Sequence, residues 1–95
     1  MIVRFHPAAR IELLEARVWY EERSPLSAVA FIQEVDAAVS RIAEEPLRYQ
    51  LLEYGTRRAP LQRFPYNIVY RIGAAEITIV AVAHQKRRPG YWIAR

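Results

Sequence analysis

The residues with the clearest chemical potential are crowded into VAHQKRRPGYW, residues 82–92. This stretch holds a histidine, three consecutive cations and two aromatic residues: His84, Lys86, Arg87, Arg88, Tyr91 and Trp92. A histidine, a tyrosine and several cations suffice for metal-free cleavage of RNA, in which a 2′-hydroxyl is deprotonated, the phosphorane dianion is stabilised and a 5′-oxygen is protonated. In such a reaction His84 and Tyr91 would act as acid and base, and Arg87 would bind the anion.

The same residues also have a structural interpretation. A histidine close to arginines at a sheet edge is common in proteins without activity, so His84 is either catalytic or structural. Arg71, on the neighbouring expected strand, has a side chain of a length that could reach the same spot. Trp92 has two equal interpretations, because it either stacks on a base or a protein partner, or fills the core and clamps the C-terminus onto the domain.

Charge is distributed very unevenly along the chain. Residues 1–56 carry six arginines against eight glutamates and one aspartate, a net charge of −3. Residues 57–95 carry seven arginines and one lysine against a single glutamate, a net charge of +7. The C-terminal half therefore favours an anionic partner, either phosphates or an acidic protein, and a solvated basic face is the alternative. The candidate target-binding residues are Arg57, Arg58, Arg63, Lys86, Arg87, Arg88 and Trp92.

Composition excludes several classes of site. The chain has no cysteine, which rules out disulfides, thiolate zinc sites and cysteine nucleophiles. His6 and His84 alone do not make a metal site, and three glycines cannot assemble a glycine-rich phosphate loop. We therefore expect neither a metal nor a cofactor. With no signal-peptide pattern and no apolar run of membrane-spanning length, a cytoplasmic protein without membrane association is expected.

Two helices are predicted in the first half. Pro7 starts the first helix, which runs to about Glu22 with Ile11, Leu14 and Val18 on its buried face and with Leu13, Ala16 and Tyr20 broadening that face. Ser24 and Pro25 begin a second helix, which ends before Pro46. Because the connection is so short, the two helices should form an antiparallel hairpin.

The remaining segments are predicted to be strands. Residues 2–5 form an opening strand, and residues 66–72 and 76–83 form an antiparallel pair joined by a glycine-containing loop. Residues 76–83 are apolar at nearly every position, which is typical of a central strand covered on both faces, whereas two prolines place residues 57–64 at an edge. We expect one α+β domain over residues 1–95: an N-terminal strand, an antiparallel helical hairpin and a three-stranded antiparallel meander in one sheet packed on the helices.

A resemblance to a known family rests on the order of these elements and on three segments: WYEERSPLSAVAFIQEVDAAVSRIAEEP, FPYNIVYRI and ITIVAVAHQKRRP. In these features the chain resembles the RelE/ParE superfamily of toxins from type II toxin-antitoxin systems. The resemblance extends from Val3 to about Trp92. It implies one of two activities. ParE-like members are not enzymes and poison DNA gyrase, whereas RelE-like members are metal-independent endoribonucleases that cut messenger RNA on the ribosome.

At individual positions the sequence resembles the ParE-like branch more closely than the RelE-like branch. RelE-like nucleases have lysines on the strand before the hairpin, where this chain has only arginines. They also have an arginine directly after the aromatic residue that opens the next strand, whereas in this chain Asn67 follows Tyr66. Lys86 and Arg87 do match a Lys-Arg step of RelE-like members, in which the arginine is catalytic. Gyrase inhibition is thus the leading hypothesis, a ribosome-dependent nuclease using His84, Arg87 and Tyr91 is the second, and a non-toxic basic binding module is the third.

The resemblance also implies a cognate antitoxin, which would cover the toxin with a helix or an extended segment and form a hetero-oligomer with it. Trp19, Tyr20 and Leu26, near the turn of the helical hairpin, are the expected contact points.

Overall fold

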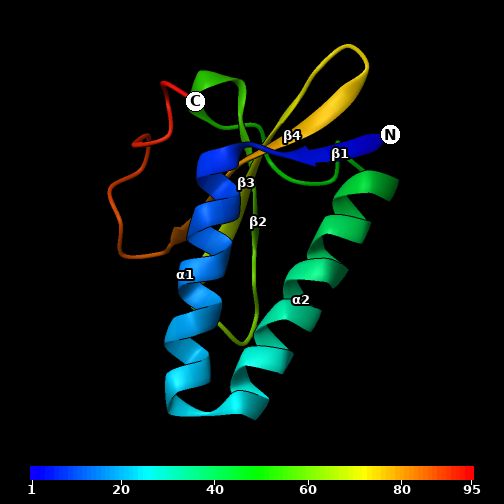
Figure 1. Cartoon of the computed structure of the whole chain (residues 1–95). Helices are drawn as coiled ribbons and strands as arrows, with labels where there is room; N and C mark the ends of the chain where they lie inside the picture. The colour runs from blue at the N-terminus through cyan, green and yellow to red at the C-terminus, as the bar shows by residue number, and fades with distance from the viewer.

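The computed structural model describes residues 1–95, and its elements follow the predicted order. These elements are β1 (Ile2–Phe5), α1 (Pro7–Arg23), α2 (Pro25–Glu44), the 3-10 turn η1 (Glu53–Gly55), β2 (Arg57–Pro60), β3 (Tyr66–Ile72) and β4 (Glu76–His84). The strands form one sheet in the order β1-β4-β3-β2, in which β1 is parallel to β4 and the other pairs are antiparallel. Figure 1 shows the two helices side by side against this sheet. The predicted α+β fold is therefore confirmed.

The helix boundaries arise from local capping. Pro7 stands in the first turn of α1, and Nδ1 of His6 accepts a hydrogen bond of 3.0 Å from the Ala8 N–H. Ser24 alone separates the helices, and its side-chain oxygen accepts a hydrogen bond of 3.3 Å from the Ser27 N–H. Each cap satisfies an amide that has no partner within its helix, which explains why both helices begin where the sequence predicted.

The main core lies between the helices and the sheet. Its largest fully buried side chains include Phe31 and Ile42 from α2 and Ile68, Tyr70 and Ile79 from the sheet. A second, smaller core lies against the other face of the sheet, where Trp92 packs with Val69, Val80, Ala81 and Ala83. Strand β4 is central and contributes to both cores, as its continuous apolar sequence predicted.

The predicted buried face of α1 is right for Leu13, Ala16 and Tyr20, which pack in or against the main core, and wrong for its other three residues. Ile11, Leu14 and Val18 are 57%, 47% and 46% exposed, whereas Ala9 and Ala16 are buried. At 3.6 residues per turn, the stripe that contains Ala9 and Ala16 lies nearly opposite the stripe of larger residues. The core lies against the stripe that contains Ala9, Leu13, Ala16 and Tyr20. An apolar stripe on α1, defined here as Ile11, Leu14 and Val18, is thereby left on the surface.

Neither α1 nor α2 combines the length and the hydropathy that a bilayer crossing requires.

Candidate functional site

His84 is the last residue of β4, where it lies opposite Tyr66 of β3 in the antiparallel register. The two rings pack edge to face, with 5.1 Å between their centroids. Nδ1 of His84 accepts a hydrogen bond of 3.1 Å from the Lys86 N–H. In a neutral ring the proton is therefore on Nε2, which makes that nitrogen a donor.

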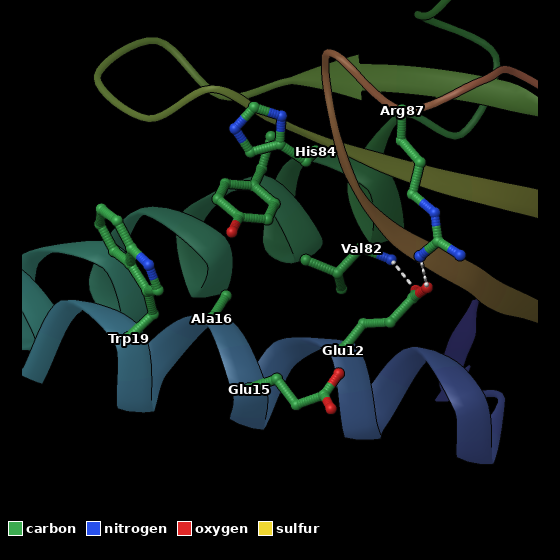
Figure 2. Close-up of a pocket in the computed structure, with 8 residues that line it drawn as sticks. Glu12, Glu15, Ala16, Trp19, Val82, His84 and Arg87 are labelled. Carbon is green, nitrogen blue, oxygen red and sulfur yellow. Dashed lines mark hydrogen bonds and ion pairs between the residues drawn. The ribbon is translucent and has the colours of Figure 1, made fainter.

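A cavity of about 240 Å³ lies between α1 and the end of β4. It is lined by Glu12, Glu15, Ala16, Trp19, Tyr66, Val82, His84 and Arg87. Figure 2 shows the Trp19 and Arg87 side chains at opposite ends of this cavity, with Glu12 reaching up from α1 toward Arg87. The structure thus brings His84 and Arg87, two of the predicted catalytic residues, to one cavity.

Glu12 is the most heavily bonded side chain at the site, and only 11% of its side-chain surface is exposed. Its Oε1 accepts hydrogen bonds from the Val82 N–H at 3.0 Å and from the Arg95 guanidinium at 2.9 Å. Its Oε2 accepts a hydrogen bond of 2.7 Å from the Tyr91 hydroxyl, and Nη1 of Arg87 lies 3.6 Å away. This carboxylate therefore holds the C-terminal segment against α1 and β4.

The position of Val82 explains part of this role. Strand β1 pairs with β4 only as far as Ile79, so the later residues of β4 have no strand beside them on that side. Glu12 accepts from the Val82 N–H, and the Arg95 guanidinium donates to the Val80 carbonyl at 3.0 Å. These two side chains thus form the hydrogen bonds that a neighbouring strand would otherwise provide. They satisfy a backbone N–H and a backbone carbonyl that would be costly to bury without a partner.

Glu12 was not singled out from the sequence, because a glutamate on an amphipathic helix is ordinary. A glutamate at the border of the buried stripe was the only signal available.

The same contacts change the chemistry available to Tyr91 and Arg87. Burial raises the pKa of the Tyr91 hydroxyl, and its hydrogen bond to Glu12 raises this pKa further. The Arg87 guanidinium lies over the Tyr91 ring, 3.8 Å from its centroid, and Glu12 is its ionic partner. Tyr91 therefore stays protonated near neutral pH and cannot act as a base there. It also does not line the His84 cavity.

The expectation that Arg71 reaches His84 is wrong. Arg71 lies opposite Thr78 in the register, six residues along β4 from His84, which corresponds to about 20 Å of strand. Its side chain also lies on the other face of the sheet, where Nη1 donates to the Arg95 carbonyl at 3.4 Å. Arg71 contacts the C-terminus and takes no part in the His84 cavity.

Three of the predicted target-binding cations are exposed and form no ion pair within the chain: Arg58, Lys86 and Arg88, called the basic trio below. The others have internal partners. Arg57 donates to the Tyr49 carbonyl at 2.6 Å, and Nε of Arg63 lies 3.2 Å from Glu34.

The structure supports the interpretation of Trp92 as a core residue, because only 7% of its surface is exposed. It therefore contributes no exposed ring to a binding surface. It does border two small cavities on its own face of the sheet.

The predicted antitoxin contacts differ in exposure. Leu26 is 81% exposed and Trp19 is half-exposed, with the Arg23 guanidinium 3.5 Å from the centroid of its ring. Tyr20 instead packs inward against Phe31 and Phe64, with ring centroids 5.2 and 5.0 Å away. Tyr20 is thus mainly a core residue, and Leu26 and Trp19 remain available to a partner.

Comparisons with known proteins identify a family. The family model for the ParE toxin of the type II toxin-antitoxin system parDE matches residues 3–89. Among solved structures, a chain from the chromosomal ParDE system of P. aeruginosa superposes with a TM-score of 0.77 over 88% of this chain and 95% of that chain, at 20% sequence identity. At this identity the superposition establishes the fold. No curated protein matches the chain.

Proposed function

The chain belongs to the ParE toxin family of type II toxin-antitoxin systems, and from this membership we propose that it arrests growth by inhibiting DNA gyrase and is neutralised by a cognate antitoxin. The resemblance seen in the sequence is confirmed at the level of the family. The observation that carries the choice of target is the basic trio, since its three cations are exposed without internal partners. Exposed, unpaired cations are suited to an anionic surface on a large assembly that holds DNA. Action on gyrase would place the protein in the cytoplasm.

Supercoiling by purified gyrase tests this proposal directly. Relaxed plasmid, ATP and gyrase are incubated with the toxin at micromolar concentration, and inhibition of supercoiling is expected. Toxin mixed beforehand with its antitoxin should leave supercoiling unchanged. Normal supercoiling at micromolar free toxin, together with growth arrest in cells, would overturn the choice of gyrase.

One observation favours a second function, a ribosome-dependent endoribonuclease. His84 and Arg87 line the same cavity, so an acid or base and an anion-binding group lie close together. Against this function, Arg87 is engaged by Glu12, and the Tyr91 hydroxyl is held away as a donor to the same carboxylate. Primer extension on translated messages after toxin induction separates the two functions, because a nuclease leaves codon-phased cuts and a gyrase inhibitor leaves none.

A non-toxic basic binding module is the third alternative. Induction in a bacterial host tests it, because harmless accumulation of folded protein would favour the module over both toxic activities.

The apolar stripe on α1 supports the antitoxin part of the proposal. Ile11, Leu14 and Val18 recur at the spacing that presents one side of a helix, and all three are exposed. Leu26, at the start of α2, is the most exposed large apolar residue of the hairpin. A contiguous apolar surface of this kind is costly in water, and an amphipathic segment of the antitoxin would bury it. We propose that the antitoxin covers this stripe together with Trp19 and Leu26.

A further inference from the structure

A second cavity, of about 220 Å³, lies between the η1 turn and the C-terminal segment. It is lined by Leu52, Glu53, Tyr54, Thr56, Arg58, Pro89, Gly90 and Trp92. None of these residues lines the cavity between α1 and β4, although a smaller cavity next to this one reaches His84 and Arg87. Its volume is below the range of pockets that hold whole drug-sized ligands and suits a single ring or side chain.

Trp92, which lines this cavity, carries an unpaired donor. Trp92 is 93% buried, since only 7% of its surface is exposed, and its indole Nε1–H has no hydrogen-bond partner. It is the only buried side-chain nitrogen or oxygen in the protein without a partner. Because buried donors are nearly always bonded, an acceptor from outside the chain, either water or a ligand atom, is expected at this N–H.

One wall of the cavity is a tyrosine ring, and the backbone of that tyrosine is strained. Tyr54 has a backbone φ of 62°, in the left-handed region that residues with side chains rarely adopt. Gly90 has a φ of 86°, and a Cβ atom there would lie 3.2 Å from the Tyr54 ring. The ring is half-exposed and rests directly on the glycine backbone. Such strain persists where the surrounding structure enforces it, and it is concentrated at functional positions.

Cations and amides continue from this cavity across the surface. Arg58 lines it and carries no ion pair, and a smaller neighbouring cavity of about 30 Å³ shares Arg58, Pro89 and Trp92 with it. Asn67 and Gln85 line the smaller cavity together with His84 and Arg87, and the two amides hydrogen-bond to each other at 3.4 Å. The other two members of the basic trio follow Gln85 in the chain. The surface thus combines an aromatic wall, an unpaired donor, amide groups and unpaired cations.

We propose that this surface binds single-stranded nucleic acid, with one unpaired base inserted beside Tyr54 and the flanking phosphates over the basic trio. A carbonyl oxygen or ring nitrogen of the base accepts the hydrogen of Trp92 Nε1–H. Aromatic stacking combined with a basic path is the common basis of single-strand binding. A paired base could not enter, so duplexes bind more weakly. The site involves no cleavage and does not depend on gyrase being the target.

Trp92 itself reports on occupancy. The chain has two tryptophans, so Trp19→Phe leaves Trp92 as the only indole fluorophore. This variant is titrated with a mixed-sequence DNA oligonucleotide of about 12 nucleotides, with the RNA of the same sequence, and with the duplex. Trp92 emission should change saturably with either single strand, and the duplex should bind about tenfold more weakly. Contact with three phosphates predicts a slope of about −2 in a plot of log binding constant against log salt concentration.

Substitutions then locate the site. Trp92→Phe keeps a ring and removes the N–H, and it should weaken single-strand binding about fivefold to tenfold, as measured by anisotropy of a labelled oligonucleotide. Arg58→Gln should weaken binding by a similar factor. Arg4→Gln removes the same charge from the exposed edge strand β1 and should leave affinity within about twofold.

Three results would overturn the proposal: unchanged Trp92 emission at saturating oligonucleotide, equal losses from Arg58→Gln and Arg4→Gln, or tighter binding of a glutamate-rich peptide of the same charge. The last result would assign the surface to an acidic protein. Should Trp92→Phe fail to fold in a thermal melt, the emission titration and the two arginine variants decide the question.

Discussion

The Tyr91 hydroxyl donates a hydrogen bond of 2.7 Å to Glu12, a residue 79 positions earlier in the chain. The same carboxylate binds the Arg95 guanidinium and the Val82 N–H. The C-terminal segment is consequently fastened to the fold instead of extending as a free basic arm. The cations of the C-terminal half therefore fall into two groups: those paired with an internal carboxylate, such as Arg87 and Arg95, and the basic trio, which forms no ion pair.

Replacing Glu12 tests how much this carboxylate stabilises the protein. Glu12→Gln keeps the shape and removes the charge, so its bonds to Arg95 and Tyr91 weaken while Arg95 stays mostly buried. We expect the free energy of unfolding, measured by urea denaturation, to fall by about 2 to 3 kcal/mol. Glu15→Gln, one turn along on the exposed surface of α1, should change it by less than about 0.5 kcal/mol. Equal effects of the two substitutions would contradict a special role for Glu12.

Alkaline pH should destabilise the protein through Tyr91. Burial raises the pKa of this hydroxyl above the value of an unfolded tyrosine, which is about 10. The folded state therefore holds this proton more tightly, so the associated stability is complete below about pH 10 and is lost as the pH rises above it. Urea denaturation between about pH 8 and pH 11 should show a decline that is shallower in Tyr91→Phe. Tyr20, Tyr66 and Tyr70, whose pKa values burial also raises, account for the remainder. Parallel declines in the two proteins would exclude Tyr91 as a cause.

Neutralising the basic trio should separate target binding from folding. Changing all three residues to alanine should raise the toxin concentration needed for half-inhibition of gyrase supercoiling at least about tenfold, because long-range attraction and direct contacts are both lost. The melting temperature should move by only a few degrees, since exposed cations contribute little to stability. Alanines at Arg4, Arg10 and Arg17 remove the same exposed charge from β1 and α1. If this control protein loses inhibition equally, net charge is responsible and the basic trio is not a docking surface.

Leu26 provides a test of the antitoxin surface. Leu26→Asp places a charge at a residue that is 81% exposed, so the fold should be unaffected while antitoxin affinity falls at least about tenfold. Leu47→Asp is the matched control, because Leu47 is 72% exposed but lies beyond the far end of the 20-residue helix α2, about 30 Å away. Isothermal titration of each variant with the antitoxin measures the difference. An unchanged affinity for Leu26→Asp would move the interface away from the hairpin turn.

The elements were predictable because their signals are local. Pro7, Ser24 and Pro46 mark where the helices begin and end, and each acts on amides within one helical turn. The β3–β4 hairpin follows from two β-rich segments around a loop that starts at Gly73. The orientation of α1 was not predictable in the same way. Its sequence carries two apolar stripes, and only the tertiary packing selects the alanine-containing one.

The candidate site was predictable only in part. His84 and Arg87 were recognised from their types and their position after a strand. Glu12 and Tyr54 were missed, because a helical glutamate and a loop tyrosine are ordinary in sequence. Arg71 was misplaced because residue spacing alone does not state which face of the sheet a side chain occupies.

The sequence by itself determined the order of the elements, the family and the strongly basic C-terminal half, because caps, strand patterns and charge are properties of neighbouring residues. Only the tertiary structure decided which stripe of α1 is buried, which cations have partners, and how Trp92 and Tyr54 enclose a cavity. The physical reason is distance along the chain. A carboxylate such as Glu12 acquires its role when the fold brings it to the end of β4 and to the C-terminal segment, and no local pattern records that contact.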